Sequence, residues 1–184
     1  MDHEAARARV LDAAERLFYG RGVHAVGMDD IRDASGVSLK RLYGLFPAKE
    51  HLTEAYLERR VTRLRRELIA HLEECENPDD RILAIFDWLR SQFADPAFRG
   101  CPLTNSHGEL GATSEAVADL IRRHKEGTRD HLRDLVTATG RPGELADRLW
   151  ILVEGAMVVA GIFGDQEAAT QARSAAVLLL DATG

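Results

Sequence analysis

The first hydrophobic pattern in the chain is a stripe of apolar residues at helical spacing near the amino terminus. The stripe consists of Val10, Ala13, Ala14, Leu17 and Phe18. These residues follow the i, i+3, i+4, i+7, i+8 order that places side chains on one face of a helix. The pattern predicts an amphipathic helix from about residue 4 to residue 20, ended by Gly20 and Gly22.

A second pattern, over residues 31–46, predicts two short helices joined by a glycine turn. Gly36 suits the positive φ that ends a helix without a Cβ clash, and Ser38 is a good N-cap for the second helix. Leu42 and Phe46 lie four residues apart and form the buried face of that helix. The opposite face carries Lys40 and Arg41. This arrangement is typical of a helix-turn-helix that reads DNA.

The rest of the chain also shows helical periodicity and few strand signals. Helical segments are expected at about 48–74, from the turn at 77–79 to about 94, at 103–110, at 114–138, and twice after the breaker at 140–143. Ala, Leu, Arg and Glu dominate, and all are good helix formers. We therefore predict an all-α fold of about nine helices. Arg59, Arg60, Arg63, Arg65 and Arg66 are expected to form a solvated face of the long helix.

Composition and charge refine this picture. The 184 residues are 45% hydrophobic, enough for a sizeable core. The net charge of −6 is divided unevenly, because residues 1–72 hold 13 Lys and Arg against 11 Asp and Glu. The remainder is strongly acidic. A mildly basic head on an acidic body suits DNA contact through one end, since phosphate attraction is local and screened within about 8–10 Å at physiological salt.

Cysteine content and hydropathy point to a reducing, aqueous compartment. The sequence has two cysteines, Cys75 and Cys101, and no apolar amino-terminal segment typical of a secretion signal. No apolar stretch reaches the roughly 20 residues that a membrane helix needs. We expect a cytoplasmic protein without a structural disulfide and without a membrane partner.

The segment from Val10 to Leu52 resembles the DNA-binding domain of the tetracycline-repressor (TetR) family of bacterial regulators. Five elements carry the resemblance: LDAAERLFYGRG at 11–22, Ile31, ASGVS at 34–38, LY at 42–43 and FPAKEHL at 46–52. The resemblance implies that the helix starting after Ser38 enters the major groove of double-stranded DNA. It also implies a three-helix head, at residues 1–50, on a ligand-binding and dimerisation body at 51–184.

The resemblance and the residue chemistry together give a set of expected DNA contacts. The set comprises Gly27, Arg32, Ser38, Leu39, Lys40, Arg41, Tyr43, Gly44 and Lys49. Lys and Arg can bond guanine O6 and N7, and a phenol can donate to phosphate. Lys49 opens a helix, whose N-terminus attracts anions, and Gly44 permits close backbone approach. The Tyr43 ring is also expected to pack against Leu17 or Phe18.

Three positions depart from the family pattern. Gly27 and Ala48 stand where Ser or Thr usually caps a helix, and Arg32 stands where Ala is common. Gly costs only a few tenths of a kcal/mol as an N-cap, and Asp29 and Asp30 favour the helix dipole. Arg32 is interpreted either as a phosphate contact or as a solvated side chain.

The body offers candidates for an apolar ligand of unknown identity. These are Phe86, Trp88, Phe93, Phe98, Cys101, Asn105, His107, Trp150 and Met157. Asn105 and His107 would orient the ligand, whereas the aromatic and Met side chains are equally good core residues. His124 and His131 lack the spacing of a convincing metal site, so neither a metal nor a cofactor is expected.

Cys101 has two interpretations. The segment 99–105 resembles a GC-x-L-x-N pattern of TetR-type sensor domains, followed by the acidic Glu109. A cysteine before Pro102 at a helix N-terminus could be a reactive thiolate that senses oxidants or electrophiles. The alternative is a small buried residue.

The last two helices carry small and aliphatic stripes that favour close packing. The expected dimer interface consists of Leu149, Leu152, Val153, Ala156, Ala160, Ala172, Ala176 and Leu179. A homodimer is expected because a palindromic operator presents two half-sites.

The function predicted from the sequence is a ligand-responsive, homodimeric transcriptional regulator, a repressor released from its operator by a small molecule. The signal is expected to pass through the long helix after Pro47. The rival interpretation is a helical carrier or enzyme. No glycine-rich phosphate loop, nucleophile elbow or paired-carboxylate motif supports catalysis.

Overall fold

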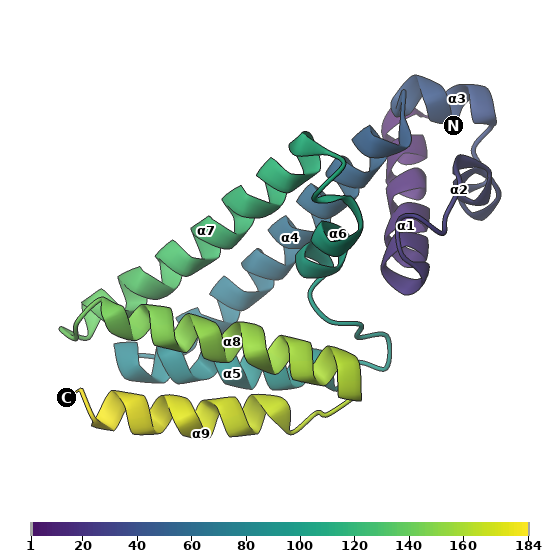
Figure 1. Cartoon of the computed structure of the whole chain (residues 1–184). Helices are drawn as coiled ribbons and strands as arrows, with labels where there is room; N and C mark the ends of the chain where they lie inside the picture. Colours follow the sequence, from purple (N-terminus) through teal and green to yellow (C-terminus); the bar gives the residue numbers. More distant parts are fainter. Residues whose placement is uncertain (1, 184) are drawn as a thin grey trace. The chain divides into compact units, whose positions relative to one another are not determined.

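All regular elements of the described residues, 2–183 in a computed structural model, are helices, as the sequence predicts. The nine helices of this part of the chain are α1 (His3–Arg21), α2 (Met28–Ser35), α3 (Leu39–Leu45), α4 (Lys49–Glu73), α5 (Pro78–Phe93), α6 (Pro102–Leu110), α7 (Glu115–Ala138), α8 (Glu144–Phe163) and α9 (Ala168–Asp181) (Figure 1).

The chain forms two compact units. The head unit comprises Met1–Arg63 and Pro102–Arg122, and the body unit comprises Leu64–Cys101 and Arg123–Gly184. The chain passes between them within α4, before α6 and within α7. The division into domains after residue 50 stays a prediction. The two compact units divide the chain differently, because α6 and the start of α7 belong to the head unit.

The core of the head unit forms where α1, α2, α3 and the first part of α4 bury their apolar faces. Its largest fully buried side chains are Tyr56, Leu11, Ile31, Leu42, Leu52, Leu57, Val10 and Val23. Asp2 caps α1 by accepting the His3 N–H, and Gly22 ends α1 with φ +87°. The ring of Phe18 meets Tyr56 edge-on at 5.8 Å, not Tyr43, which is 46% exposed. No ring contact between Phe18 and Tyr43 is found among the described residues, and the alternative packing of Tyr43 against Leu17 stays a prediction.

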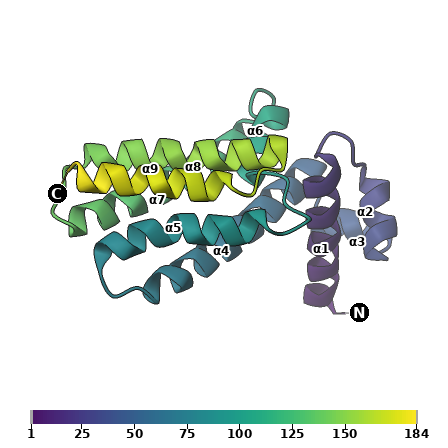
Figure 2. The same ribbon diagram turned by 90° about the horizontal axis from the view of Figure 1, so that it is seen from below.

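The body unit has its core between α5, α8 and α9, which pack side by side in both views (Figures 1 and 2). α9 runs antiparallel to α8 after a short connection. Asn77 caps α5 by accepting the Asp80 N–H at 2.7 Å, and Pro78 occupies the first turn, as the turn at 77–79 predicts.

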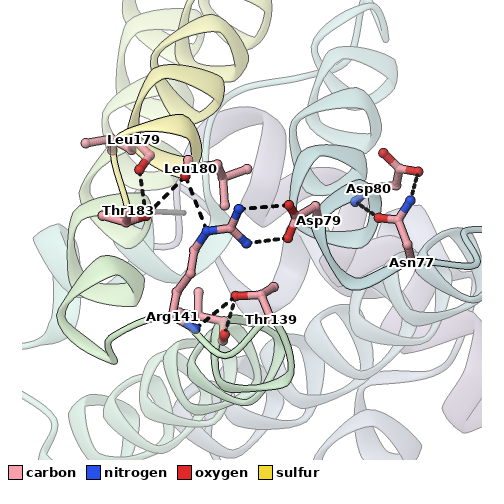
Figure 3. A network of polar contacts seen from close by, with 9 residues as sticks. Asn77, Asp79, Asp80, Thr139, Arg141, Leu179, Leu180 and Thr183 are labelled. Atoms are coloured by element: carbon pink, nitrogen blue, oxygen red, sulfur yellow. Dashed lines mark hydrogen bonds and ion pairs between the residues drawn. The ribbon is translucent and has the colours of Figure 1, made fainter.

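Arg141 joins three parts of the body unit (Figure 3). Its guanidinium donates to both carboxylate oxygens of Asp79, at 2.5 and 2.9 Å, and its Nε donates to the carbonyl of Leu180 at 3.3 Å. The loop before α8 is thus tied to the start of α5 and the end of α9. The sequence marked residues 140–143 as a breaker and did not predict this link.

Candidate nucleic-acid interface

The turn between α2 and α3 has the geometry of a helix-turn-helix. Gly36 ends α2 with φ +64° and ψ 22°, and its N–H donates to the Arg32 carbonyl at 2.9 Å. A Cβ at this position would lie 2.7 Å from the guanidinium of Arg9. The left-handed backbone therefore favours glycine here, and the flexible end of the Arg9 side chain lies where a Cβ would project. Val37, 3% exposed, fills the corner.

α3 buries one face and exposes the other, as predicted. Leu42 and Phe46 are buried, whereas Lys40, Tyr43 and Gly44 are exposed. Leu39 is also exposed, and Arg41 is half-buried. The outward face of α3 therefore combines cationic donors, a phenol and a position without a side chain. These groups can bond base edges and phosphates.

The polar groups of this face are not committed to internal contacts. Within residues 2–183, neither Lys40 nor Arg41 forms an ion pair. Ser38 occupies the N-cap position of α3, yet its hydroxyl makes no capping hydrogen bond in the described structure. Lys49 is half-buried at the start of α4. Their role as DNA contacts stays a prediction.

Gly27, the N-cap of α2, and Arg32, within α2, both have intramolecular partners. The Gly27 N–H donates to the Asp30 carboxylate at 2.8 Å, which compensates for the missing side-chain cap. Arg32 pairs with Asp29 at 2.6 Å and Asp33 at 2.8 Å. The hydrogen bond and charge of Asp33, with the charge of Asp29, raise the pKa of Arg32. Arg32 is thus ion-paired with two acids of its own helix, which neither of the two sequence interpretations included.

Three arginines of α4 converge on Glu15 of α1. Glu15 accepts hydrogen bonds from Arg59 at 3.1 Å, Arg60 at 2.8 Å and Arg63 at 2.6 Å. Arg60 also stacks on the ring of Tyr19, 3.7 Å from its centroid. Burial opposes ionisation of Glu15, but the hydrogen bond and charge of Arg63 and the neighbouring guanidiniums outweigh it and lower the Glu15 pKa. The expected solvated face is wrong for Arg59 and Arg60, which are partly buried, whereas Arg63 is exposed although it is ion-paired, and Arg65 and Arg66 are exposed as expected.

Glu109, in the last turn of α6, holds the connection between α1 and α2. Its carboxylate accepts the backbone N–H groups of Val23 at 3.0 Å and His24 at 2.7 Å. A Cβ on Gly22 would lie 3.1 Å from this carboxylate. Nearby in the chain, the Ser114 hydroxyl donates to the Glu50 carboxylate of α4. The α6–α7 segment is therefore attached to the head at two points.

The predicted ligand residues are divided between the units. Phe86 and Phe93 are buried in the body core, and Trp88, Phe98, Trp150 and Met157 are partly buried against it. The rings of Phe93 and Phe98 lie 4.8 Å apart. Asn105 and His107 are exposed on α6, in the head unit. Core packing accounts for the contacts of Phe86 and Phe93, and a ligand role for the set stays a prediction.

Two polar features of the body unit were not predicted. Lys125 donates to both carboxylate oxygens of Glu154, at 2.7 and 2.6 Å, and lies 5.5 Å from the Trp150 ring centroid. His131 is half-buried, and burial with the charge of Arg65 lowers its pKa despite the opposing charge of Asp134. Cys101 is half-buried directly before α6, which leaves both of its interpretations open.

The expected dimer residues lie mostly inside the chain's own core. Leu149, Val153, Ala156, Ala160, Ala172 and Ala176 are all buried, and Leu152 and Leu179 are half-buried. The exposed apolar residues of α8 are instead Ile151, Val158, Ile162 and Phe163, with Leu178 on α9. The six buried residues pack α8 and α9 within one chain, so they are not available to a partner. The face of α8 that remains exposed to a partner is the neighbouring one, which carries Ile151, Val158 and Ile162.

The fold and its exposed reading helix define the class of helix-turn-helix DNA-binding regulators. Residues 10–56 match the family model of bacterial regulatory proteins of the tetR family, and residues 78–176 match the tetracyclin repressor-like C-terminal domain. The chain belongs to the TetR family. Members of this family are DNA-binding transcriptional regulators and not enzymes.

Individual relatives agree with this assignment. An uncharacterized HTH-type transcriptional regulator of Mycobacterium tuberculosis is 37% identical over 121 residues, a match spanning 64% of this chain and 60% of that protein. The regulator LmrA of Bacillus subtilis is 26% identical, covering 86% of this chain and 88% of its own. The TetR-family regulator SCO4454 of Streptomyces coelicolor superposes with a TM-score of 0.92 at 27% identity, covering 98% and 96% of the two chains.

No helix in the described residues is long and apolar enough to cross a membrane.

Proposed function

We propose that this regulator acts as a homodimeric repressor, which reads a palindromic operator through α3 and is released by a small molecule bound to the body. The observation that carries the proposal is the outward face of α3. It presents Lys40, Arg41 and Tyr43 without intramolecular ion pairs in the described structure, on a helix anchored by buried Leu42 and Phe46. Such a face is chemically matched to base edges and phosphates.

An exposed apolar stripe on α8 supports the dimer. Ile151, Gly155, Val158 and Ile162 follow the i, i+4, i+7, i+11 order of one helical face, and all four are exposed. A Cβ on Gly155 would meet nothing within 4 Å, so another helix can approach closely there. We propose that α8 and α9 of two copies pack across a two-fold axis, with Leu178 at its side.

Release by a ligand is a shift between two dimer states with different spacing of the reading helices. The ligand can shift this equilibrium only by its differential affinity for the two states. Glu109 and Ser114 support a route through α6 to the head, beside the route through α4. A signal that moves α6 would act on the connection before α2.

Selection of bound sequences from a random DNA library tests this proposal. The unaltered protein is expected to enrich a palindrome, and Lys40→Ala with Arg41→Ala is expected to lose it. A matched control replaces Arg122 and Arg123, an adjacent exposed basic pair on α7. Absence of enrichment by the unaltered protein, even at low salt, would contradict DNA reading. Equal loss in the control would contradict the assignment to α3.

A further inference from the structure

Most arginines of the head unit are paired with acidic side chains of the same unit. The paired set is Arg21, Arg32, Arg59, Arg60, Arg63 and Arg122. Arg7 and Arg9, two residues apart on α1, differ from this set. Across residues 2–183, neither guanidinium takes part in an ion pair or a hydrogen bond to an acid. Both cations therefore keep their donors available for an external anion.

The Arg9 side chain lies against the turn that precedes α3. Its Nη2 would be 2.7 Å from a Cβ on Gly36, the residue that ends α2 two positions before the N-cap of α3. The side chain is exposed. The left-handed glycine thus makes room for a cation immediately ahead of α3.

Arg7 lies against the other end of α3. Its guanidinium carbon is 5.5 Å from the ring centroid of Phe46, the C-cap residue of α3. A guanidinium stacked on a ring keeps its in-plane N–H groups free to donate. The two arginines of α1 are therefore placed at the two ends of the same short helix.

The size of α3 relates these positions to DNA. With its side chains, a helix such as α3 is about 10–12 Å across, close to the roughly 12 Å width of the major groove. When such a helix fills the groove, side chains of the helix packed beside it are held next to the phosphate backbones that form the walls. From this geometry we infer that Arg7 and Arg9 bind backbone phosphates beside the ends of α3 and extend the DNA interface to α1. This inference rests on the proposed DNA reading by α3.

The test measures how the affinity for the enriched DNA duplex depends on salt concentration. Each phosphate contact contributes about 0.9 to the slope of log K against log salt. In a dimer, Arg9→Gln should reduce the magnitude of the slope by about 1.8, and Arg7→Gln with Arg9→Gln by about 3.6. Both should weaken binding without changing the preferred sequence. Arg9→Lys should restore most of the slope, because it keeps the charge.

Arg16→Gln is the matched control. Arg16 is exposed on the same face of α1, seven residues from Arg9 and therefore about 10.5 Å along the helix. Its replacement should leave the slope unchanged. Circular dichroism of each variant shows whether a loss of DNA affinity is caused by unfolding. The single variant Arg9→Gln leaves the contact between Arg7 and Phe46 intact.

The outcomes separate this inference from the proposed function. An unchanged slope in Arg9→Gln and in the double variant, with intact binding by the unaltered protein, would overturn the phosphate contacts and leave α3 in place. Weaker binding with an unchanged slope would also overturn them, because it would indicate a positioning role. If the unaltered protein enriches no DNA, the proposed function itself fails.

Discussion

At the scale of single residues, one carboxylate can fix a loop that carries no regular structure. Glu109 accepts two successive backbone N–H groups, from Val23 and His24, at the point where α1 ends. Backbone donors paired with an ionised acceptor form strong hydrogen bonds. The loop before α2 therefore depends on a residue of α6.

Glu109→Ala should open this loop locally. The variant leaves the Val23 and His24 amides without their acceptor, at a cost of about 1–2 kcal/mol. Hydrogen exchange at these two amides should become about 5- to 30-fold faster. Glu126→Ala, on an exposed position of α7, serves as the control and should change neither amide. Unchanged exchange in Glu109→Ala would show that the carboxylate does not hold the loop.

At the scale of elements, the ion cluster around Glu15 joins α1 to α4. One carboxylate, 14% exposed, faces three guanidiniums. Asp12 pairs with Arg59 as well, at 2.8 Å, but removing the Glu15 carboxylate leaves Arg60 and Arg63 without this shared acid in a partly buried site. The cluster therefore stabilises the packing of the two helices and positions the end of α4 that belongs to the head unit.

Glu15→Gln should lower the free energy of unfolding by about 1–3 kcal/mol near pH 7, a value reduced for the partial exposure of the arginines. Because folding lowers the Glu15 pKa from 4.5, its stabilisation is complete above pH 4.5 and is lost as the pH falls through the folded value. Denaturant unfolding should therefore show the variant approaching the unaltered protein below pH 4.5. A difference that does not depend on pH would argue against an ionic cause.

The elements that the sequence predicts well are those defined by neighbouring residues. The helix-turn-helix depends on Gly36, Ser38 and Leu42, whose spacing is local, and the structure confirms its turn and buried face. The Glu15 cluster joins residues 44 to 48 positions apart, and Glu109 lies 86 positions from Val23. Periodicity carries no information on such pairs.

The sequence could not resolve the faces of α8 for a different reason. This helix is apolar around most of its circumference, so hydrophobic spacing does not separate the side that meets α9 from the side left for a partner. The small residues at 156 and 160 were expected at the dimer interface, yet they are buried in the chain. The same ambiguity affects the aromatic residues predicted for the ligand.

At the scale of the whole molecule, the exposed apolar face of α8 and α9 is the central feature. Ile162 is 71% exposed and Leu178 is 70% exposed. Large exposed apolar side chains along one helical face are typical of an interaction site. A second copy of the same chain would bury it in an isologous contact.

Ile162→Glu should convert the dimer to a monomer, because two unpaired carboxylates would be buried across the two-fold axis. Analytical ultracentrifugation measures the change in mass. Ala138→Glu, an exposed position at the end of α7, is the control and should stay dimeric. A dimeric Ile162→Glu variant would place the interface elsewhere.

The most direct test of the central claim, that two copies of the chain read two half-sites, is the affinity for the enriched DNA duplex with about half a helical turn, roughly 5 bp, inserted at its centre. The insertion rotates one half-site to the far side of the duplex, so we predict that affinity falls to the level of non-specific DNA. Inserting about 10 bp should restore the orientation, though not the spacing. Undiminished affinity for the duplex with the half-turn insertion would contradict a rigid dimer with two reading helices.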